Sequence, residues 1–302
     1  MGSFQAYAMS SSTRQHYVPQ FLLRHFAPEQ HPSQVWAYDK RVGAGRLQSI
    51  RDSGHENRFY EHEGLRRRGV NLEATLAEFE GSVAPFIAAC VQQHSLGFVG
   101  PLERAAILDF ALVQLFRTRA AREFAKAGSE QVLGKKIAEK DAQEMSLAVL
   151  LRDFPRYRAC CESHIVTLRE AQEGERFLLG DGVTLIAAMA PSASFRSAIK
   201  GAVIMVPLCP TLCIMLFPSR FQSDLEFAGA WYRQEIGVLD EAQPTAPGDV
   251  KSANAMSVFT SNRFVFSSTE DFTDVELLLR SNPAATKGPV GNREELSWPS
   301  SD

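Results

Sequence analysis

The chain has few cysteines, and their spacing suits neither a zinc finger nor a disulfide framework. Five occur among 302 residues, and the sequence contains no Cys-x-x-Cys. The odd count and the adjacent Cys160 and Cys161 also argue against a set of disulfides. We therefore expect free thiols and a reducing, cytoplasmic location.

Long apolar runs and an excess of one charge are absent as well. No unbroken apolar run reaches the roughly 18 residues that a membrane span requires, so we expect no membrane contact. Lys and Arg total 32 against 35 Asp and Glu, which gives a formal net charge of −3. This balance argues against broad electrostatic binding to nucleic acid, although it permits a local basic patch.

The common catalytic signatures are also missing. The sequence has no Walker loop, no Gly-x-Ser-x-Gly, no His-Glu-x-x-His and no Gly-x-Gly-x-x-Gly. Any activity must therefore depend on residues that come from separate parts of the chain.

The first half of the chain predicts helices. Asn71 is a good N-cap, and the apolar residues that follow it keep a 3.6-residue period as far as Cys90. The segment 102–116 is apolar on nearly every face, which is typical of a central buried helix. Residues 123–163 predict two further surface helices.

Strands are predicted at both ends of this helical block. Val35–Asp39 and Arg46–Ile50 flank a glycine turn and predict a hairpin, and Arg58–Tyr60 predicts a third extended piece. After residue 163 the pattern alternates, with a further hairpin over 202–206 and 211–217. We therefore predict an α+β fold in which a helical lobe packs on a mostly antiparallel sheet formed largely by the carboxyl-terminal half.

This pattern sets the expected domain boundaries. Residues 14–281 form a single domain, of which 14–163 are mainly helical with a small β-hairpin and 164–281 are mainly antiparallel sheet plus helix. Residues 1–13 are expected to be a flexible leader. Residues 282–302 are rich in Ser, Pro, Gly and charge and are expected to be a disordered tail.

The most distinctive stretch, at residues 16–26, reads HYVPQFLLRHF. Pro19 suits the first turn of a helix, and Gln20 and Arg24 fall four residues apart on one face of it. His16 lies in the extended entry to this helix. Either these three side chains point into a shared pocket, or His16 and Gln20 simply hydrogen-bond the junction between loop and helix.

This stretch resembles the amino-terminal signature of a bacterial and fungal family catalogued as domain of unknown function 4238. The family pattern also has a Glu at the place of Glu80, an Arg-Thr pair at Arg117, and an Asn-helix-Arg-aromatic ending, which matches the predicted helix with Asn254 and the Arg263-Phe264 pair after it. It usually shows Ser-Asp-Asn-Pro where this chain has Asp181 between two glycines. The resemblance implies no established activity.

The remaining candidate residues follow from their positions. Glu80 lies at the border of an apolar stripe, and Arg117 ends a buried helix, where a charge requires a partner. Arg117 therefore either pairs with Glu80 or Asp181, or holds a bound anion. Asp181 lies at a strand end between two glycines, and Asn254 lies on a helix that faces the sheet.

Two functions fit these residues. The first is a hydrolase of a phosphodiester or other anionic substrate, with His16, Glu80 and Asp181 as catalytic residues. Glu80 and Asp181 would hold a divalent metal such as Mg²⁺, and the substrate would contact the residues Gln20, Arg24, Arg117 and Asn254. The second is a non-catalytic module of a bacterial defence system that senses a ligand or binds a protein. Expected partners are an anionic small molecule, nucleic acid or a protein, and no membrane.

Overall fold

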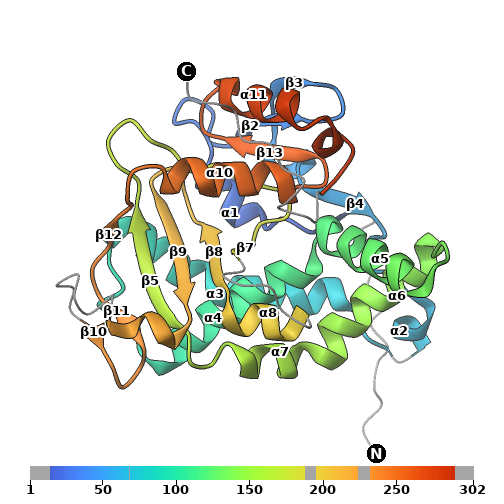
Figure 1. Ribbon diagram of the computed structural model, residues 1–302, viewed down its shortest axis with the longest axis horizontal. Coiled ribbons are helices and arrows are strands. Elements are labelled where there is room, and N and C mark those ends of the chain that lie inside the picture. Colours follow the sequence, from blue (N-terminus) through green and yellow to red (C-terminus); the bar gives the residue numbers. More distant parts are fainter. Residues whose placement is uncertain (1–13, 68, 188–194, 224–231, 290–302) are drawn as a thin grey trace, which may run out of the picture.

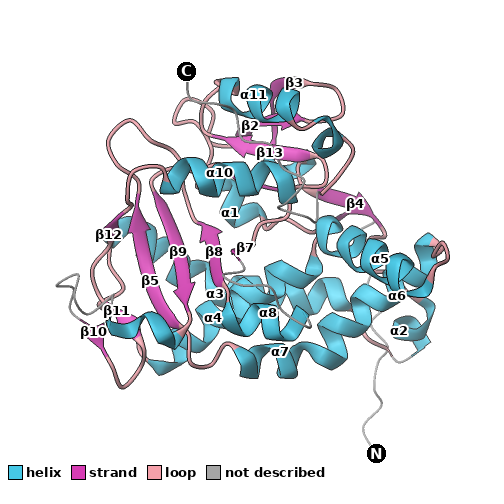
Figure 2. Cartoon of the chain, in the orientation of Figure 1, coloured by secondary structure: helices cyan, strands magenta, loops and turns pink. Residues whose placement is uncertain are grey.

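The computed structural model describes residues 14–67, 69–187, 195–223 and 232–289. The predicted leader, 1–13, lies outside these ranges. In the described residues the α+β prediction is confirmed, with helices and sheets interleaved along the chain (Figure 2). The five cysteines are all free, and Cys160 is the one that is not fully buried.

The helices of the described residues are α1 Gln20–Arg24, α2 Glu63–Arg67, α3 Leu72–Gln93, α4 Pro101–Arg117, α5 Arg119–Leu133, α6 Glu139–Ala148, α7 Phe154–Cys160, α8 Phe195–Gly201, α10 Asp249–Thr260 and α11 Thr273–Ser281. The strands are β1 Arg14–His16, β2 Gln34–Asp39, β3 Ala44–Ser49, β4 His55–Asn57, β5 Ile165–Glu170, β6 Leu179–Gly180, β7 Leu185–Ala187, β8 Val203–Pro207, β9 Leu212–Phe217, β10 Tyr232–Arg233, β11 Val238–Leu239, β12 Gln243–Pro244 and β13 Phe264–Ser267. A π-helical turn at Val149–Asp153 connects the end of α6 to the start of α7.

Helices α3 and α4 form where the sequence predicts them. The Asn71 side chain accepts a hydrogen bond from the Ala74 N–H at 3.1 Å and so caps α3. Pro101 begins α4 after Gly100, in the position where its missing N–H costs nothing. Leu108 and Leu112 of α4 are fully buried, which confirms the central helix.

The larger sheet has the order β10-β11-β5-β9-β8-β7, and β12 pairs with β5 outside this path. The strands β5, β9, β8 and β7 pair antiparallel, while β11 and β12 run parallel to β5. Helices α3 and α4 cover one face of this sheet and α10 runs across its upper end (Figure 1). The predicted hairpin over 202–217 is β8 and β9.

The smaller sheet joins the two halves of the chain, which the predicted division into 14–163 and 164–281 does not anticipate. Its order is β3-β2-β13-β6, so the early hairpin pairs with strands from the carboxyl-terminal half. Helix α10 packs Val250 and Met256 against the larger sheet and Val258 and Phe259 against the smaller one. The hairpin is therefore part of a common core, because its own apolar face needs these partners.

Two predicted boundaries differ from the structure. The third strand is β4, three residues before Arg58–Tyr60, and it pairs with β1 rather than with the hairpin. The predicted tail begins too early, because residues 283–286 form a 3₁₀ turn in which Ala285 is fully buried. Asn282 supports this turn by donating its Nδ2–H to the Leu278 carbonyl at 3.0 Å. Residues 290–302 lie outside the described ranges.

By length and composition alone, α3 is the one helix in the described part of the chain that is able to cross a membrane. Its apolar stripe, which includes Val83, Ile87 and Cys90, is buried in the main core. A core helix passes the same test, so α3 is not a clear membrane span.

The buried His164 is expected to make the stability depend on pH. Its Nε2 lies 3.1 Å from the Ala202 carbonyl, and burial lowers its pKa below 6.5. As the pH falls through 6.5, the unfolded chain therefore binds a proton that the folded protein does not, and stability is lost. Urea unfolding at pH 7.5 and pH 5.5 should give a smaller loss for His164→Gln than for the native chain.

The exposed His31 offers the control, since His31→Gln should leave this pH dependence unchanged. Equal losses of stability in the native chain and in His164→Gln would contradict the assignment.

Candidate functional site

The backbone of His16 is held by side chains from two helices and from the loop that contains Tyr60. The His16 carbonyl accepts a hydrogen bond from Nη2 of Arg117 and another, at 3.2 Å, from the Tyr60 hydroxyl. The His16 N–H donates to the carboxyl group of Glu73. Besides its pairing with β4, β1 is therefore held at His16 by side chains from α3, from α4 and from the loop that contains Tyr60.

Arg117 is the centre of this arrangement. Its side chain is 2% exposed, and Nη1 forms an ion pair with Glu80 on α3. Its Nε donates to the Tyr60 hydroxyl at 3.0 Å. Burial opposes the charged form, but Tyr60 and Glu80 outweigh it and raise the pKa of Arg117. Of the alternatives left open by the sequence, the structure contains the pair with Glu80.

The imidazole of His16 lies at the junction with α1, half-buried. Its Nε2 donates to the Arg51 carbonyl at 3.1 Å, which leaves Nδ1 as an acceptor for the Gln20 amide at 3.4 Å. Burial lowers the pKa of His16. Gln20 therefore lies with His16 as predicted, whereas Arg24 is exposed, because Leu22 and Leu23 take the buried face of this short helix.

Asp181 belongs to a different part of the molecule. Its carboxylate accepts hydrogen bonds from the N–H groups of Asn262, Arg263 and Phe264 at 2.6, 2.9 and 3.0 Å. The residue is fully buried, and burial raises its pKa. A Cβ on Gly180 would lie 2.5 Å from the Ser257 carbonyl oxygen, so this turn needs glycine to approach α10.

Asn254 is likewise occupied by backbone groups. Its Oδ1 accepts from the Leu178 N–H at 2.7 Å, and its Nδ2 donates to the Arg176 carbonyl at 2.8 Å. The amide therefore joins α10 to the chain that enters β6. The structure thus brings together His16, Gln20, Glu80 and Arg117, and it places Asp181 and Asn254 in separate backbone networks.

A cavity of about 290 Å³ lies beside the Arg117 cluster, between α2 and the start of α3. Its walls include Gln15, Tyr60 and Glu73, together with Glu61, His62, Leu65, Gly69, Val70, Asn71 and Leu72. Glu73 reaches both the cavity and β1. Burial raises the pKa of Glu73, and the charge of Glu80 adds to this effect while Arg117 opposes it.

Two polar atoms of this wall lack a partner among the described residues. Oε2 of Glu73 is buried without a hydrogen bond. Gln15 is 2% exposed, and its Oε1 accepts from the Tyr60 N–H at 2.6 Å, while no bond is formed by its Nε2 within the described chain. Glu73 and Gln15 thus each have one polar atom without a partner among the described residues.

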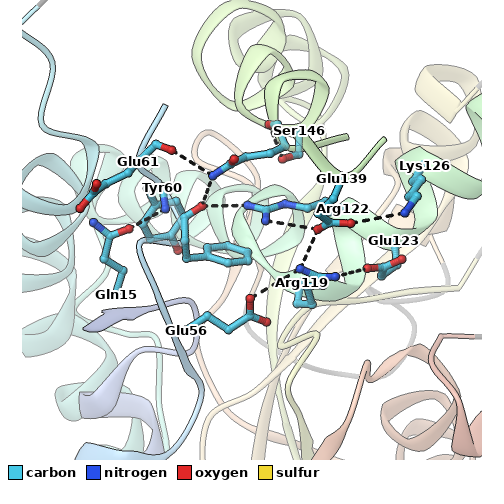
Figure 3. Close-up of polar contacts among 12 residues, drawn as sticks. Gln15, Glu56, Tyr60, Glu61, Arg119, Arg122, Glu123, Lys126, Glu139 and Ser146 are labelled. Carbon is cyan, nitrogen blue, oxygen red and sulfur yellow. Dashed lines mark hydrogen bonds and ion pairs between the residues drawn. The ribbon is translucent and has the colours of Figure 1, made fainter. Parts of the chain in front are cut away.

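Polar side chains of α5 and α6 contact β4 and the segment that follows it, which includes Tyr60 and Glu61 of the cavity wall (Figure 3). Gln143 of α6 donates to the carbonyls of Phe59 and Glu61 at 2.8 and 3.2 Å. Arg119 of α5 joins Glu56 of β4 at 3.5 Å to Glu139 of α6 at 2.8 Å. The cavity-lining segment is therefore bonded to α6, and the strand before it to α5.

Sequence reasoning missed Gln15 and Glu73. Glu73 precedes Glu80 by seven residues and so lies on the same face of α3, a spacing that was available in the sequence. Gln15 gave no such signal, because its burial depends on the packing of β1 against the segment around Tyr60.

No further metal ligands lie beside the predicted pair Glu80 and Asp181 in the described part of the chain. Within the described ranges no three side chains of His, Cys, Asp or Glu are grouped closely enough to hold a metal ion. Glu80 is bound to Arg117, and Asp181 is bound to backbone N–H groups.

Replacing the guanidinium of Arg117 should destabilise the protein. Arg117→Lys keeps the charge but cannot reach Tyr60, Glu80 and His16 together, so buried partners lose their bonds. We expect a loss of about 3 kcal/mol in the free energy of unfolding, measured by urea denaturation. Arg152→Lys, at an exposed ion pair, is the matched control and should change little.

Asp181→Asn tests the second network. An amide places N–H groups against backbone donors, and we expect a loss on the order of 3 kcal/mol by the same measurement. Glu173→Gln, on an exposed loop, should be neutral. A stable, fully folded Asp181→Asn protein would show that the carboxylate is not needed for the fold.

Comparison with known proteins assigns the family without assigning an activity. A search of curated proteins and a search of solved structures each gave no match. The family model described as Protein of unknown function (DUF4238) matches residues 14–271. The chain therefore belongs to this family, as its opening motif indicated.

Proposed function

We propose that the chain binds a small polar ligand without converting it, and that the cavity beside Glu73 is the binding site. The observation that carries this proposal is Oε2 of Glu73, a buried atom without a hydrogen bond on a residue of the cavity wall, together with the Gln15 amide of the same wall, whose Nε2 forms no hydrogen bond within the described chain. Buried polar atoms are normally hydrogen-bonded, so a ligand with complementary groups would remove a cost that the free protein carries.

The state of the other polar residues favours binding over hydrolysis. A phosphodiester hydrolase needs a cation that is free to face the substrate, whereas each nitrogen of Arg117 already has a partner in the protein. Asp181 and Asn254 are engaged by the backbone. His16 retains a proton-accepting Nδ1, but Gln20 lies against it.

The cavity is also placed to sense its ligand. The carboxyl group of Glu73 lies in the cavity wall and holds the His16 N–H at the same time. A ligand that attracts this carboxyl group would therefore change the hydrogen bonding of β1. This supports a sensing role within the cytoplasmic location that the cysteine usage predicts.

The proposal predicts a ligand-dependent rise in thermal stability that requires Glu73. The melting midpoint is measured with a panel of small amides, amines, carboxylates and nucleotides, each with and without Mg²⁺ or Mn²⁺. At least one compound should raise the midpoint by mass action, and Glu73→Ala should weaken its binding about tenfold or more. Glu78→Ala, exposed on the same helix, should bind as the native chain does.

Two outcomes would count against this function. A ligand whose affinity is the same in Glu73→Ala would place the site elsewhere. Turnover of a phosphodiester with Mg²⁺ or Mn²⁺ would instead support the hydrolase.

A further inference from the structure

A pair of histidines, His16 and His55, lies between β1 and β4. The two residues are directly opposed in the antiparallel register of this two-stranded sheet, so their side chains lie on the same face. Their ring centroids are 5.3 Å apart, and the rings meet edge to face. Neither residue lines the cavity of the proposed function, so the behaviour of this pair does not depend on ligand binding there.

The hydrogen bonds of the two rings suit the neutral form. Nε2 of His16 donates to the Arg51 carbonyl at 3.1 Å, and Nδ1 faces the Gln20 amide. Nδ1 of His55 is buried and has no hydrogen-bond partner among the described residues. An imidazolium carries a proton on both nitrogens, so a charged His55 would bury a donor without an acceptor. The surroundings of the pair therefore oppose its protonation.

The nearby charges act in the same direction. Burial lowers the pKa of His16, and the hydrogen bond to the Arg51 carbonyl counteracts this effect. The charges of His55, Arg117 and Arg14 lower the pKa of His16 further. Neither ring forms an ion pair with a carboxylate within the described residues.

The acidic groups on the neighbouring elements already have partners. These are Asp52 with Arg14, Glu80 with Arg117, Glu56 with Arg119, and Glu73 with the His16 N–H. The other charged side chains next to the pair, Arg24 of α1 and Arg51 of the turn before β4, are exposed cations. Two imidazolium rings at this separation would therefore repel each other with no carboxylate bound to either one.

The strands β1 and β4 are sensitive to such repulsion because their sheet is small. Each strand has three residues, and neither pairs with a further strand in the described chain. A sheet of two short strands is marginal without support from side-chain contacts. Charge on His16 and His55 therefore acts directly on the pairing of these strands.

We propose that His16 and His55 form an acid-sensitive switch that loosens β1 from β4. At neutral pH the two rings are uncharged and pack together, whereas under acid conditions both are charged and the strands separate more often. β1 also carries Gln15, whose Oε1 accepts from the Tyr60 N–H at 2.6 Å. Loosening of β1 therefore releases the Tyr60 N–H as well.

The direction of the pH dependence follows from the proton affinities of the closed and open forms. The closed form holds a proton on His16 less tightly than the open form, so the pairing is fully present above pH 6.5 and is lost as the pH falls below it. A histidine that stays neutral in the closed form and titrates with its ordinary pKa in the open form favours opening about tenfold at pH 5.5.

Hydrogen exchange of single amides, read by NMR at pH 7.5 and pH 5.5, tests the switch. The two reporters are the Tyr60 N–H and the Tyr17 N–H, which donates to the Gly54 carbonyl at 2.9 Å beside β4. After correction for the intrinsic exchange rate at each pH, their protection factors should fall about tenfold at pH 5.5. The amide of Leu112, in the middle of α4, should lose less and reports unfolding of the whole chain.

Three variants assign the effect. The double variant His16→Gln/His55→Gln should retain the protection of both reporters at pH 5.5, apart from any loss that Leu112 also shows. His55→Gln alone should reduce the loss. His31→Gln, at an exposed histidine, should behave as the native chain does.

If the double variant does not fold, the ring resonances of the native chain decide. An NMR titration of both imidazoles should show coupled steps, with the second proton bound below about pH 6. Two independent titrations near pH 6.5 would overturn the switch. Unchanged protection of the two reporters at pH 5.5, or an equal loss in the native chain and the double variant, would overturn it as well.

Discussion

The fold on the side of α3 and α4 depends on one buried charge, the guanidinium of Arg117. A cation 2% exposed to solvent is tolerated only when its partners replace the water it has lost. Those partners come from three places, namely Glu80 on α3, the hydroxyl of Tyr60 and the carbonyl of His16. Because one side chain must satisfy all three, the positions of β1, α3 and α4 are determined together.

A second buried charge joins the sheets to α10. Asp181 binds three successive N–H groups at the start of β13, and Lys40 lies close enough for its charge to act on Asp181. Lys40 donates to the carbonyls of Val258 and Ser261 at 2.8 and 2.6 Å, and burial lowers its pKa to about 8. One buried hydrogen-bond network therefore connects the end of α10, the early hairpin and β6 within an apolar core.

The cavity wall differs from the networks of Arg117 and Asp181, because not all of its polar groups have hydrogen-bond partners. Glu73 belongs to the Arg117 cluster through the His16 N–H, yet its other oxygen has no partner. A group that bonded to Glu73 at the proposed site would compete with the bonds that hold β1. The proposed binding and the arrangement of the opening motif would thereby be linked.

The sequence by itself determined the elements whose signals are local. The Asn71 cap, the apolar period of α3, the Pro at the start of α4 and the β8–β9 hairpin all depend on neighbours in the chain. It also indicated that Arg117 needs a partner. Tertiary structure decided the pairing of Arg117 with Glu80, the enclosure of Asp181 and Asn254 by backbone groups, and the exposure of Arg24. It alone created the cavity, because Gln15 and Glu73 come from distant segments whose meeting depends on long-range packing, which no local pattern encodes.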